Sequence, residues 1–501
     1  MLRIKRSVIH GPVAKIQPKY DEISRLFALT KNCRKALRHQ RFGAFEAMPE
    51  ISQYLPTKRI KSYMVHTLNL EYSLSLPEFL SLLPDIRATA HFNGADLDSF
   101  MKLRKTYFVF SSDVVGITFI KVTHHPQSYY FYLHFTIDLR ALIVGHLTND
   151  LFLPDYIGLM NLSQAYCQAI LKIFPSLARY DLNIARIMFE SDKTTQINSG
   201  LLAIPYFMLG KVSRIDYSKN LLACRYFDLT QELMKKTVFN PNLAITRPED
   251  SNNFYASSNK TSKKNRSSLI KGYSRELYCE HLENDLEEDI YLSLVEGSKN
   301  IIRYELSRIK PKKDWVINNY GLDKEVWADS PFILSPIVLL DPSICDKIIG
   351  DSYKKHIGLG DWYGRKQLAS IIKKSGLRIK KKLLEATCPV LRKCRSVMDA
   401  YHKCTSTNGY YLNPPGKTIK MTSATFKNHL EKGLSIGVQL FSIPDERKVS
   451  HVVNPWKSAL NSPKNFCIVW DIPDVFKANI NAMLYIIWDR LGRYAPCQEG
   501  L

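Results

Sequence analysis

The sequence predicts an α+β fold, in which an antiparallel sheet precedes a mainly helical part. Three segments rich in aromatic and β-branched residues, at 106–111, 116–122 and 128–137, are separated by turn or polar residues and are typical of consecutive antiparallel strands. A long apolar-periodic stretch at 157–177 predicts a helix that ends near Pro175. Strand and helix patterns mix without a repeating βαβ rhythm, which favours α+β over a doubly wound parallel sheet.

Further strands are expected on both sides of this group. The β-rich run Tyr-Met-Val-His-Thr-Leu-Asn-Leu at 63–70 predicts a first core strand, and residues 211–216 and 301–309 predict two later ones. A helix is expected at 228–237. The polar run at 248–268 predicts a loop.

After residue 323 the pattern becomes helical and dense in cations. Residues 365–384 alternate apolar pairs with basic ones around a break at Gly376. Residues 421–437 predict a short helix that begins at the cap residue Ser423 and stops at Gly433.

The length of 501 residues exceeds what one hydrophobic core usually holds, so two or three domains are expected. We predict a basic N-terminal extension at 1–58, a sheet-containing domain at 59–323 and a helical, basic domain at 324–501.

The charge balance indicates a polyanionic partner. Lys and Arg number 70 against 47 Asp and Glu, which gives a net charge of +23 at pH 7. A surplus of this size attracts nucleic acid, although acidic proteins or membrane surfaces remain alternatives. The ten cysteines form no Cys-x-x-Cys pair, no secretory signal is evident, and the apolar runs are too short to span a bilayer, so a reducing cytoplasm is expected.

Three short charged-aromatic motifs follow one another in the middle of the chain. They are Ser-Arg-Ile-Asp at 213–216, Leu-Ile-Lys-Gly-Tyr-Ser-Arg at 269–275 and Ile-Arg-Tyr-Glu-Leu at 302–306. In order and wording they resemble the gene II replication proteins of filamentous phages and related plasmids, which read Arg-aliphatic-Asp, Leu-Lys-x-Tyr-x-Lys and Arg-aromatic-Glu. The stretch at 421–437 is similar to a Thr-Phe-x-x-His segment near the end of many members, so the resemblance spans roughly residues 64–437.

This resemblance implies a nickase-like catalytic domain that starts rolling-circle replication. Proteins of this family cut one strand of duplex DNA at an origin, hold the 5′ phosphate on a tyrosine and rejoin the ends later. The resemblance further implies a divalent cation, Mg²⁺ or Mn²⁺, DNA in both duplex and single-stranded form, and the helicase and polymerase of a bacterial host. Such a cation acts as a Lewis acid and orients the phosphate.

Tyr273 is the expected nucleophile because it matches the family's tyrosine. In an extended strand Lys271 and Arg275 would share its face, where they would favour the phenolate and bind phosphate. The family usually has Lys where Arg275 stands, which keeps the charge but changes the geometry. A structural role for Tyr273 is the alternative, and Tyr278 is then the next candidate.

Asp216 and Glu305 are the expected carboxylate ligands of the cation. Each follows an arginine by two positions, Arg214 and Arg303, so acid and base would project from one face of a strand. The alternative is a buried Arg–carboxylate pair that holds two strands together. Asp181 presents a competing Arg-x-Asp motif.

His134 is the expected third ligand. It lies in an aromatic strand that is followed by Gly-His at 145–146, similar to the family's Gly-His-Asn except that Leu147 replaces the Asn. A histidine satisfied within the core is the alternative.

Two other functions compete with the nickase. A DNA-binding regulator of a phage or plasmid, without catalysis, explains the charge and the helical C-terminal part equally well. An RNA-binding protein would show aromatic stacking motifs on a sheet, and the sequence holds no run like Lys/Arg-Gly-Phe-Gly-Phe.

Overall fold

The computed structural model describes residues 65–89, 94–124, 130–179, 200–223, 225–246, 252–257, 267–280, 282, 288–327, 330–413, 415–458, 468 and 470–491. The predicted N-terminal extension at 1–58, the competing Asp181 and most of the polar run at 248–268 lie outside the described residues.

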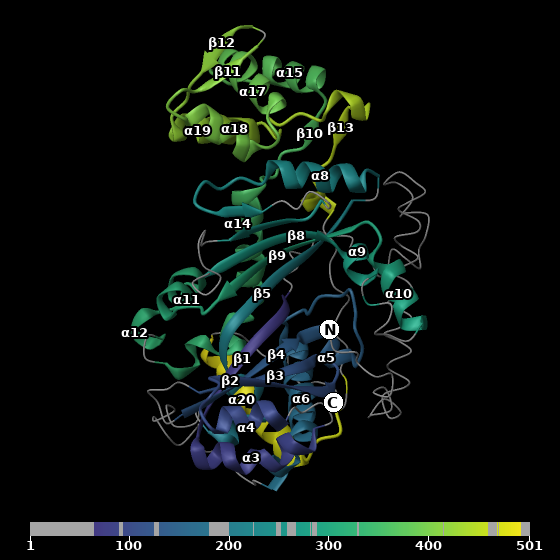
Figure 1. The fold of residues 1–501 in the computed structure, drawn as a ribbon, viewed down its shortest axis with the longest axis vertical. Coiled ribbons are helices and arrows are strands. Elements are labelled where there is room, and N and C mark those ends of the chain that lie inside the picture. The colour runs from purple at the N-terminus through teal and green to yellow at the C-terminus, as the bar shows by residue number, and fades with distance from the viewer. Residues whose placement is uncertain are drawn as a thin grey trace.

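A nine-stranded antiparallel sheet runs through the larger part of the molecule (Figure 1). Its strand order is β2-β3-β4-β1-β5-β9-β8-β7-β6. The strands are β1 (Val65–Ser75), β2 (Tyr107–Val114), β3 (Ile117–His124), β4 (Tyr130–Asp138), β5 (Lys211–Leu222), β6 (Ala244–Thr246), β7 (Phe254–Ser257), β8 (Ser268–Ser274) and β9 (Ile301–Ile309). The expectation of a mixed α and β protein with a large antiparallel sheet is therefore confirmed.

The sheet has one apolar face, which we call the rear face. In β1 the residues Leu68, Leu70, Tyr72 and Leu74 are fully buried and alternate with polar ones, as a strand with one covered face requires. On the rear face Phe79 stacks on Phe131 with ring centroids 4.6 Å apart. Because aromatic side chains fill the rear face, the segments of β2 to β4 are rich in aromatic residues. This composition makes them recognisable as strands from the sequence alone.

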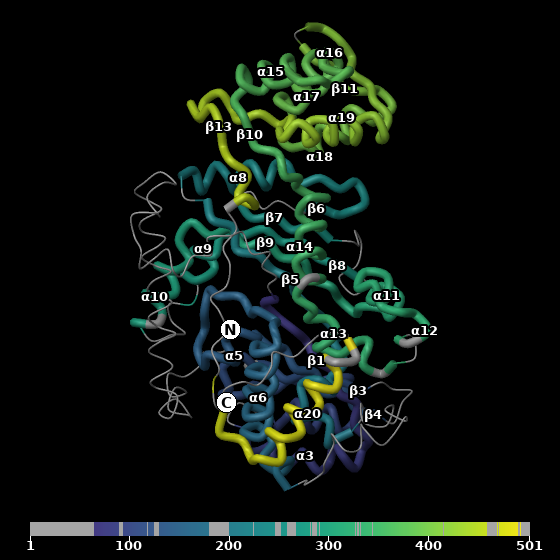
Figure 2. The backbone as a smooth tube through the Cα atoms, turned by 180° about the vertical axis from the view of Figure 1, so that it is seen from behind, coloured from purple at the N-terminus to yellow at the C-terminus, as the bar shows by residue number. Residues whose placement is uncertain are grey.

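Helices cover the rear face of the sheet. Helix α3 (Leu76–Ala88) contacts β1 and β4, α6 (Tyr156–Ile173) contacts β2, and α14 (Pro342–His356) contacts β5 and β9, while α20 (Asp474–Arg490) packs on α6. Figure 2, which views the molecule from behind, shows α14 and α20 on this side. Shorter helices of this half are α4 (Gly94–Met101), α5 (Leu139–Val144), α8 (Phe227–Thr237), α9 (Arg275–Glu280), α10 (Glu288–Ser298), α11 (Lys313–Tyr320), α12 (Lys324–Trp327) and α13 (Pro336–Leu339).

A smaller helical lobe lies at the end of the molecule opposite α3 (Figures 1 and 2). It contains α15 (Arg365–Lys374), α16 (Lys380–Lys382), α17 (Cys388–Lys393), α18 (Val397–Thr405) and α19 (Ser423–Ser435), with two-stranded sheets formed by β10 (Trp362–Tyr363) and β13 (His451–Val452), and by β11 (Tyr410–Leu412) and β12 (Lys417–Ile419). Helices α14 and α20 follow residue 323 in the sequence, yet they pack on the half of the molecule that holds the sheet. The predicted domain boundary at residue 323 therefore stays a prediction.

Helix α15 ends at Lys374, close to the expected break at Gly376. Helix α19 differs from the prediction at both ends, because it is capped by the Thr422 hydroxyl and continues through Gly433 to Ser435. Gly433 continues the helix for a packing reason, since a Cβ there would lie 2.6 Å from Leu440 Cγ. None of the described helices combines the length and the apolar character needed to cross a lipid bilayer.

Gly272, between Lys271 and Tyr273, is required by close packing. A Cβ at this position would overlap the Phe254 ring on the neighbouring strand, and neither element can move without disturbing the sheet. We expect Gly272→Ala to lower the free energy of unfolding by about 1–3 kcal/mol. Urea titration measures this. Gly376→Ala is the matched control, because nothing lies within 4 Å of its added Cβ, and an equal loss there would contradict the packing argument.

Candidate active site

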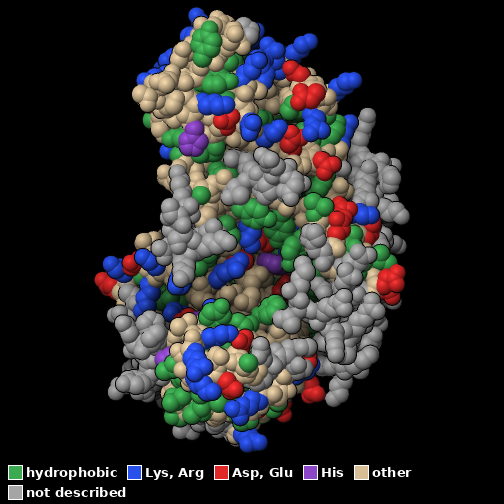
Figure 3. All heavy atoms as spheres, viewed as in Figure 1, with side chains coloured by type: hydrophobic (Ala, Val, Ile, Leu, Met, Phe, Trp, Pro, Cys, Tyr) green, Lys and Arg blue, Asp and Glu red, His purple; other side chains and the backbone are tan. Residues whose placement is uncertain are grey.

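The face of the sheet opposite the helices, which we call the front face, is polar. Directly paired residues of neighbouring strands project to the same side, and here Lys271 of β8 pairs with Glu305 of β9, while Tyr273 pairs with Arg303. Asn220 of β5 lies opposite Arg303. Figure 3 shows a hollow near the middle of this view, with Lys or Arg and His side chains at its floor.

Glu305 is the centre of a hydrogen-bonded cluster on this face. The Tyr273 hydroxyl donates to Glu305 Oε1 at 2.6 Å, and Lys271 Nζ donates to Oε2 at 3.0 Å. Glu305 is 1% exposed, whereas Tyr273 and Lys271 are half-buried. The structure therefore brings three of the residues predicted from the motifs into one site.

His66 joins this cluster through an irregularity in β1. The register with β5 shifts between Val65 and Leu68, a β-bulge that takes His66 out of the simple alternation of the strand. Its Nδ1 lies 3.6 Å from Glu305 Oε1, and its Nε2 lies 3.4 Å from Asp138 Oδ2. The imidazole thus connects two carboxylates from different strands.

Arg303 lies buried next to the cluster. Its Nε donates to Asn220 Oδ1 at 2.9 Å and its Nη2 to the Asn149 carbonyl at 2.7 Å. The side chain is 0% exposed and does not hydrogen bond to Glu305, so it acts on the carboxylate as a nearby fixed charge.

The pKa values describe a neutral phenol bound to an ionised carboxylate. Burial raises the pKa of Tyr273, and the negative charge of Glu305 raises it further, against a lowering by Arg303 and Arg275. Burial would also raise the pKa of Glu305, but Lys271, His66, Arg303 and the Tyr273 hydrogen bond bring it well below its ordinary value. The expectation that flanking cations favour the phenolate is not met in this arrangement, because Lys271 contacts Glu305 instead.

Arg275 does not continue the strand that carries Tyr273. Strand β8 ends at Ser274, and Arg275 is the first residue of α9. It is buried, and its Nε and Nη2 donate to Asn149 Oδ1 at 3.2 and 3.0 Å. Tyr278 follows on α9, 48% exposed, with its ring centroid 5.9 Å from that of Tyr273.

Asp216 lies on the neighbouring strand β5, diagonal to Glu305, because it pairs with Ser307. Both of its carboxylate oxygens accept hydrogen bonds from Arg214, at 2.9 and 2.6 Å, and Asp216 is 2% exposed. Arg214 lies on the same strand and is half-buried, so this ion pair forms within β5 and does not join two strands as the alternative supposed. Asp216 and Glu305 share a face of the sheet, but each is neutralised by its own cation.

His134 lies apart from these two acids. It pairs with Glu71 across β4 and β1, with Nδ1 3.6 Å from Glu71 Oε2, and its Nε2 lies 2.8 Å from the Thr123 hydroxyl. Strands β1 and β5 lie between β4 and β9, and three strand spacings of about 4.8 Å make roughly 14 Å. The structure therefore does not bring His134 together with Asp216 and Glu305.

The predicted metal ligands do not form a metal centre as arranged. The oxygens of Asp216 face Arg214, and those of Glu305 face Tyr273, Lys271 and His66. Among the described residues, no group of three or more His, Cys, Asp or Glu side chains is arranged to hold an ion. The donor set therefore fits an ion-pair network and not a cation with open coordination positions.

Exposed aromatic side chains extend the front face across β2, β3 and β4. Tyr107, Phe119 and Tyr130 are each 51% exposed, and Lys121 Nζ lies 4.6 Å from the centroid of the Tyr107 ring. Lys121 pairs with His134, so these side chains share the face that carries Glu305. Aromatic rings beside cations are typical of surfaces on which bases stack.

Sequence reasoning missed His66 and Asp138. His66 lies in a segment that was expected to be a strand, whereas Asp138 directly follows the strand expected at 128–137, and the signal for His66 was available. Alternation is regular from Thr67 onward, so Val65 and His66 are out of step with it. Such a break is typical of a bulge that redirects a side chain.

No protein-family model matches this chain, and comparison with curated proteins and with solved structures finds no similar protein.

Glu305→Gln tests the electrostatic role of the carboxylate. The pKa of Glu305 is lowered from 4.5 in the folded protein, so its contribution to stability is complete above pH 4.5 and decreases as the pH falls toward the folded pKa. We expect a loss of about 3 kcal/mol at pH 7, because Lys271 loses its ion-pair partner beside the buried charge of Arg303, and a smaller loss at pH 3. Urea titration at both pH values measures it.

Glu280→Gln is the control for this experiment, since Glu280 is exposed on α9. A loss for Glu305→Gln that is the same at both pH values would contradict the assignment.

Proposed function

We propose that the protein initiates rolling-circle replication by nicking and rejoining one DNA strand at an origin, with Tyr273 as nucleophile. The observation that carries the proposal is the 2.6 Å hydrogen bond from the Tyr273 hydroxyl to Glu305 on the polar face of an antiparallel sheet. A phenol paired with a carboxylate beside a lysine supplies the nucleophile, proton acceptor and phosphate-binding cation that such chemistry needs. The resemblance of the three motifs supports the same assignment.

In the proposed step the Tyr273 oxygen attacks phosphorus. A bond forms between this oxygen and phosphorus, the bond from phosphorus to the 3′ oxygen breaks, and the departing 3′ oxygen takes up a proton from water. The phenolic proton passes to Glu305 along the existing hydrogen bond. In the reverse step a 3′ hydroxyl attacks the phosphotyrosine, and Glu305 returns the proton.

Lys271 couples phosphate binding to the basicity of Glu305. Its charge makes the largest lowering contribution to the pKa of that carboxylate, and its Nζ donates a hydrogen bond to Oε2 at 3.0 Å. A DNA phosphate that attracts Lys271 leaves Glu305 less stabilised as an anion. The carboxylate then becomes a stronger base when the substrate is bound.

No step is assigned to a metal, since the predicted ligands Asp216, Glu305 and His134 do not fit one in this arrangement. The resemblance still makes Mg²⁺ or Mn²⁺ the ions to include in an assay. A host helicase and polymerase would extend the nicked strand.

The front face also favours a single-stranded substrate next to the site. Bases would stack on Tyr107, Phe119 and Tyr130, and Lys121 and Lys211 would neutralise phosphates. The net charge of +23 provides the attraction over longer distances.

A DNA-binding regulator without catalysis is the second candidate, and one observation favours it. Both acids of the site are paired with cations, and the pKa of the Tyr273 phenol is raised by burial. A centre of this kind can be held together by its ion pairs alone. The two functions differ in one product, a covalent protein–DNA adduct that survives denaturant.

Tyr273→Phe is expected to abolish both nicking and the adduct, because it removes the attacking oxygen and leaves the ring. The measurement is conversion of supercoiled origin DNA to open circles in Mg²⁺ or Mn²⁺, with adducts resolved on a denaturing gel. Tyr278→Phe is the matched control and should keep both. If Tyr273→Phe nicks at the normal rate, Tyr273 is not the nucleophile; if the unaltered protein forms no adduct, the regulator is the better assignment.

Phe119→Ala is expected to weaken binding of a single-stranded oligonucleotide by about 1–2 kcal/mol, the contribution of one stacked base. Fluorescence anisotropy at constant salt measures the change in Kd. Tyr485→Ala removes an equally exposed ring, 57% exposed on α20 and away from the sheet, and should leave the affinity unchanged. Equal affinities for the two variants would exclude a stacking role for the front face.

A further inference from the structure

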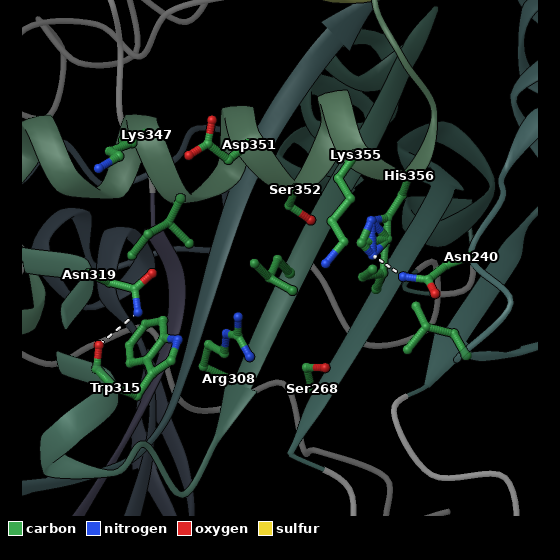
Figure 4. Close-up of a pocket in the computed structure, with 14 residues that line it drawn as sticks. Asn240, Ser268, Arg308, Trp315, Asn319, Lys347, Asp351, Ser352, Lys355 and His356 are labelled. Carbon is green, nitrogen blue, oxygen red and sulfur yellow. Dashed lines mark hydrogen bonds between the residues drawn. The ribbon is translucent and has the colours of Figure 1, made fainter. Parts of the chain in front are cut away.

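A second cavity lies on the rear face, behind the strands that carry Tyr273 and Glu305. It has a volume of about 260 Å³, is partly open, and is lined by residues of β8, β9, α11 and α14 and of the segment between α8 and β6 (Figure 4). Ile270 and Leu306 form part of its floor. These residues alternate with Lys271 and Glu305 along the same two strands, so the cavity and the candidate active site lie on opposite faces of one strand pair.

The charged residues of the cavity are predominantly cationic. Arg308, Lys347 and Lys355 line it, against a single acid, Asp351. Figure 4 shows Lys355 of α14 and Arg308 of β9 entering the space from opposite sides. An excess of positive charge in a concave site of this size favours an anionic ligand.

Two buried donors in the cavity have no hydrogen-bond partner. Arg308 stacks on Trp315, 4.8 Å from the ring centroid, yet its Nε is buried and unpaired. His356 is 9% exposed, and its Nδ1 is likewise unpaired. Unpaired buried polar atoms cost free energy, and a ligand in the cavity would satisfy these two once their side chains turn toward it.

The tautomer of His356 makes its unpaired nitrogen a donor. The amide nitrogen of Asn240, which can only donate, lies 3.4 Å from His356 Nε2. Nε2 is therefore the acceptor, and a neutral ring carries its proton on Nδ1. The two unpaired nitrogens are thus N–H donors, and two lysine ammonium groups line the same cavity as the single Asp351 carboxylate.

We propose that this cavity binds the phosphate group of a small phosphorylated metabolite no larger than a mononucleotide. A phosphate presents several strong acceptor oxygens on a tetrahedral centre, which matches donors converging from Arg308, Lys355 and His356. Trp315, on which Arg308 stacks, and Asn319 lie toward the end of the cavity away from His356, where an aromatic ring and an amide can contact the organic part of the ligand (Figure 4). The volume accommodates a compact ligand and not a folded nucleic acid.

Isothermal titration calorimetry of the full chain tests this with three probes, pyrophosphate, AMP and adenosine, at one ionic strength. We expect pyrophosphate or AMP to bind and adenosine not to bind. If only pyrophosphate binds, the site recognises the phosphate alone, and tighter binding of AMP shows recognition of the organic part. Adenosine binding as tightly as AMP, or no binding of either phosphate compound at millimolar concentration, would overturn the proposal.

The matched pair Lys355→Gln and Lys354→Gln separates this site from general attraction of anions by a basic protein. Both lysines are exposed on α14, but only Lys355 lines the cavity. Lys355→Gln should weaken binding roughly tenfold, as expected for one charge-assisted contact, while Lys354→Gln should leave it unchanged. Equal losses would overturn the proposal. Since the nicking assay reports on the opposite face, failure here does not affect the proposed function.

Discussion

The buried carboxylate of Glu305 is the charge on which the front face of the sheet depends. Lys271, His66 and the Tyr273 hydroxyl all contact it, the first and last from β8 and His66 from β1. An isolated carboxylate at this depth would be costly, so its partners must be in place for the sheet to be stable. The same contacts hold a phenol beside a proton acceptor. Stability and candidate chemistry therefore depend on one group.

The two faces of the sheet follow from one property of strands. Successive side chains alternate, so β8 and β9 carry Lys271, Tyr273 and Glu305 on the front, with Ile270 and Leu306 on the rear. Gly272 fits this pattern because its missing side chain gives space to Phe254. Among the described residues, helices cover one side of the nine-stranded sheet, and the other side carries the candidate site. The rear cavity exists because α14 contacts β9 without filling the space above Arg308.

The acids of the candidate site are balanced by nearby cations, whereas the chain as a whole carries a surplus of positive charge. Arg214 neutralises Asp216, and Lys271 neutralises Glu305, so the centre carries little net charge. The surplus of +23 is carried elsewhere, in part by exposed lysines. This arrangement favours a polyanion that binds first through the surface and then competes for the internal cations. Competition for Lys271 is the step that would change the proton affinity of Glu305.

Sequence by itself indicated β1 to β5 and β9 as strands of an antiparallel sheet and singled out Tyr273, Lys271 and Glu305, but it predicted a loop at 248–268, where β7 forms. Alternation and aromatic content are local properties, and the three motifs carried the residues that meet at β8 and β9. Only the tertiary structure decided which groups complete the site. His66 enters through a bulge whose effect depends on the register between β1 and β5, and His134 is excluded because two strands separate it from Glu305. Register and strand order are set by packing over the whole sheet, and no local pattern specifies them.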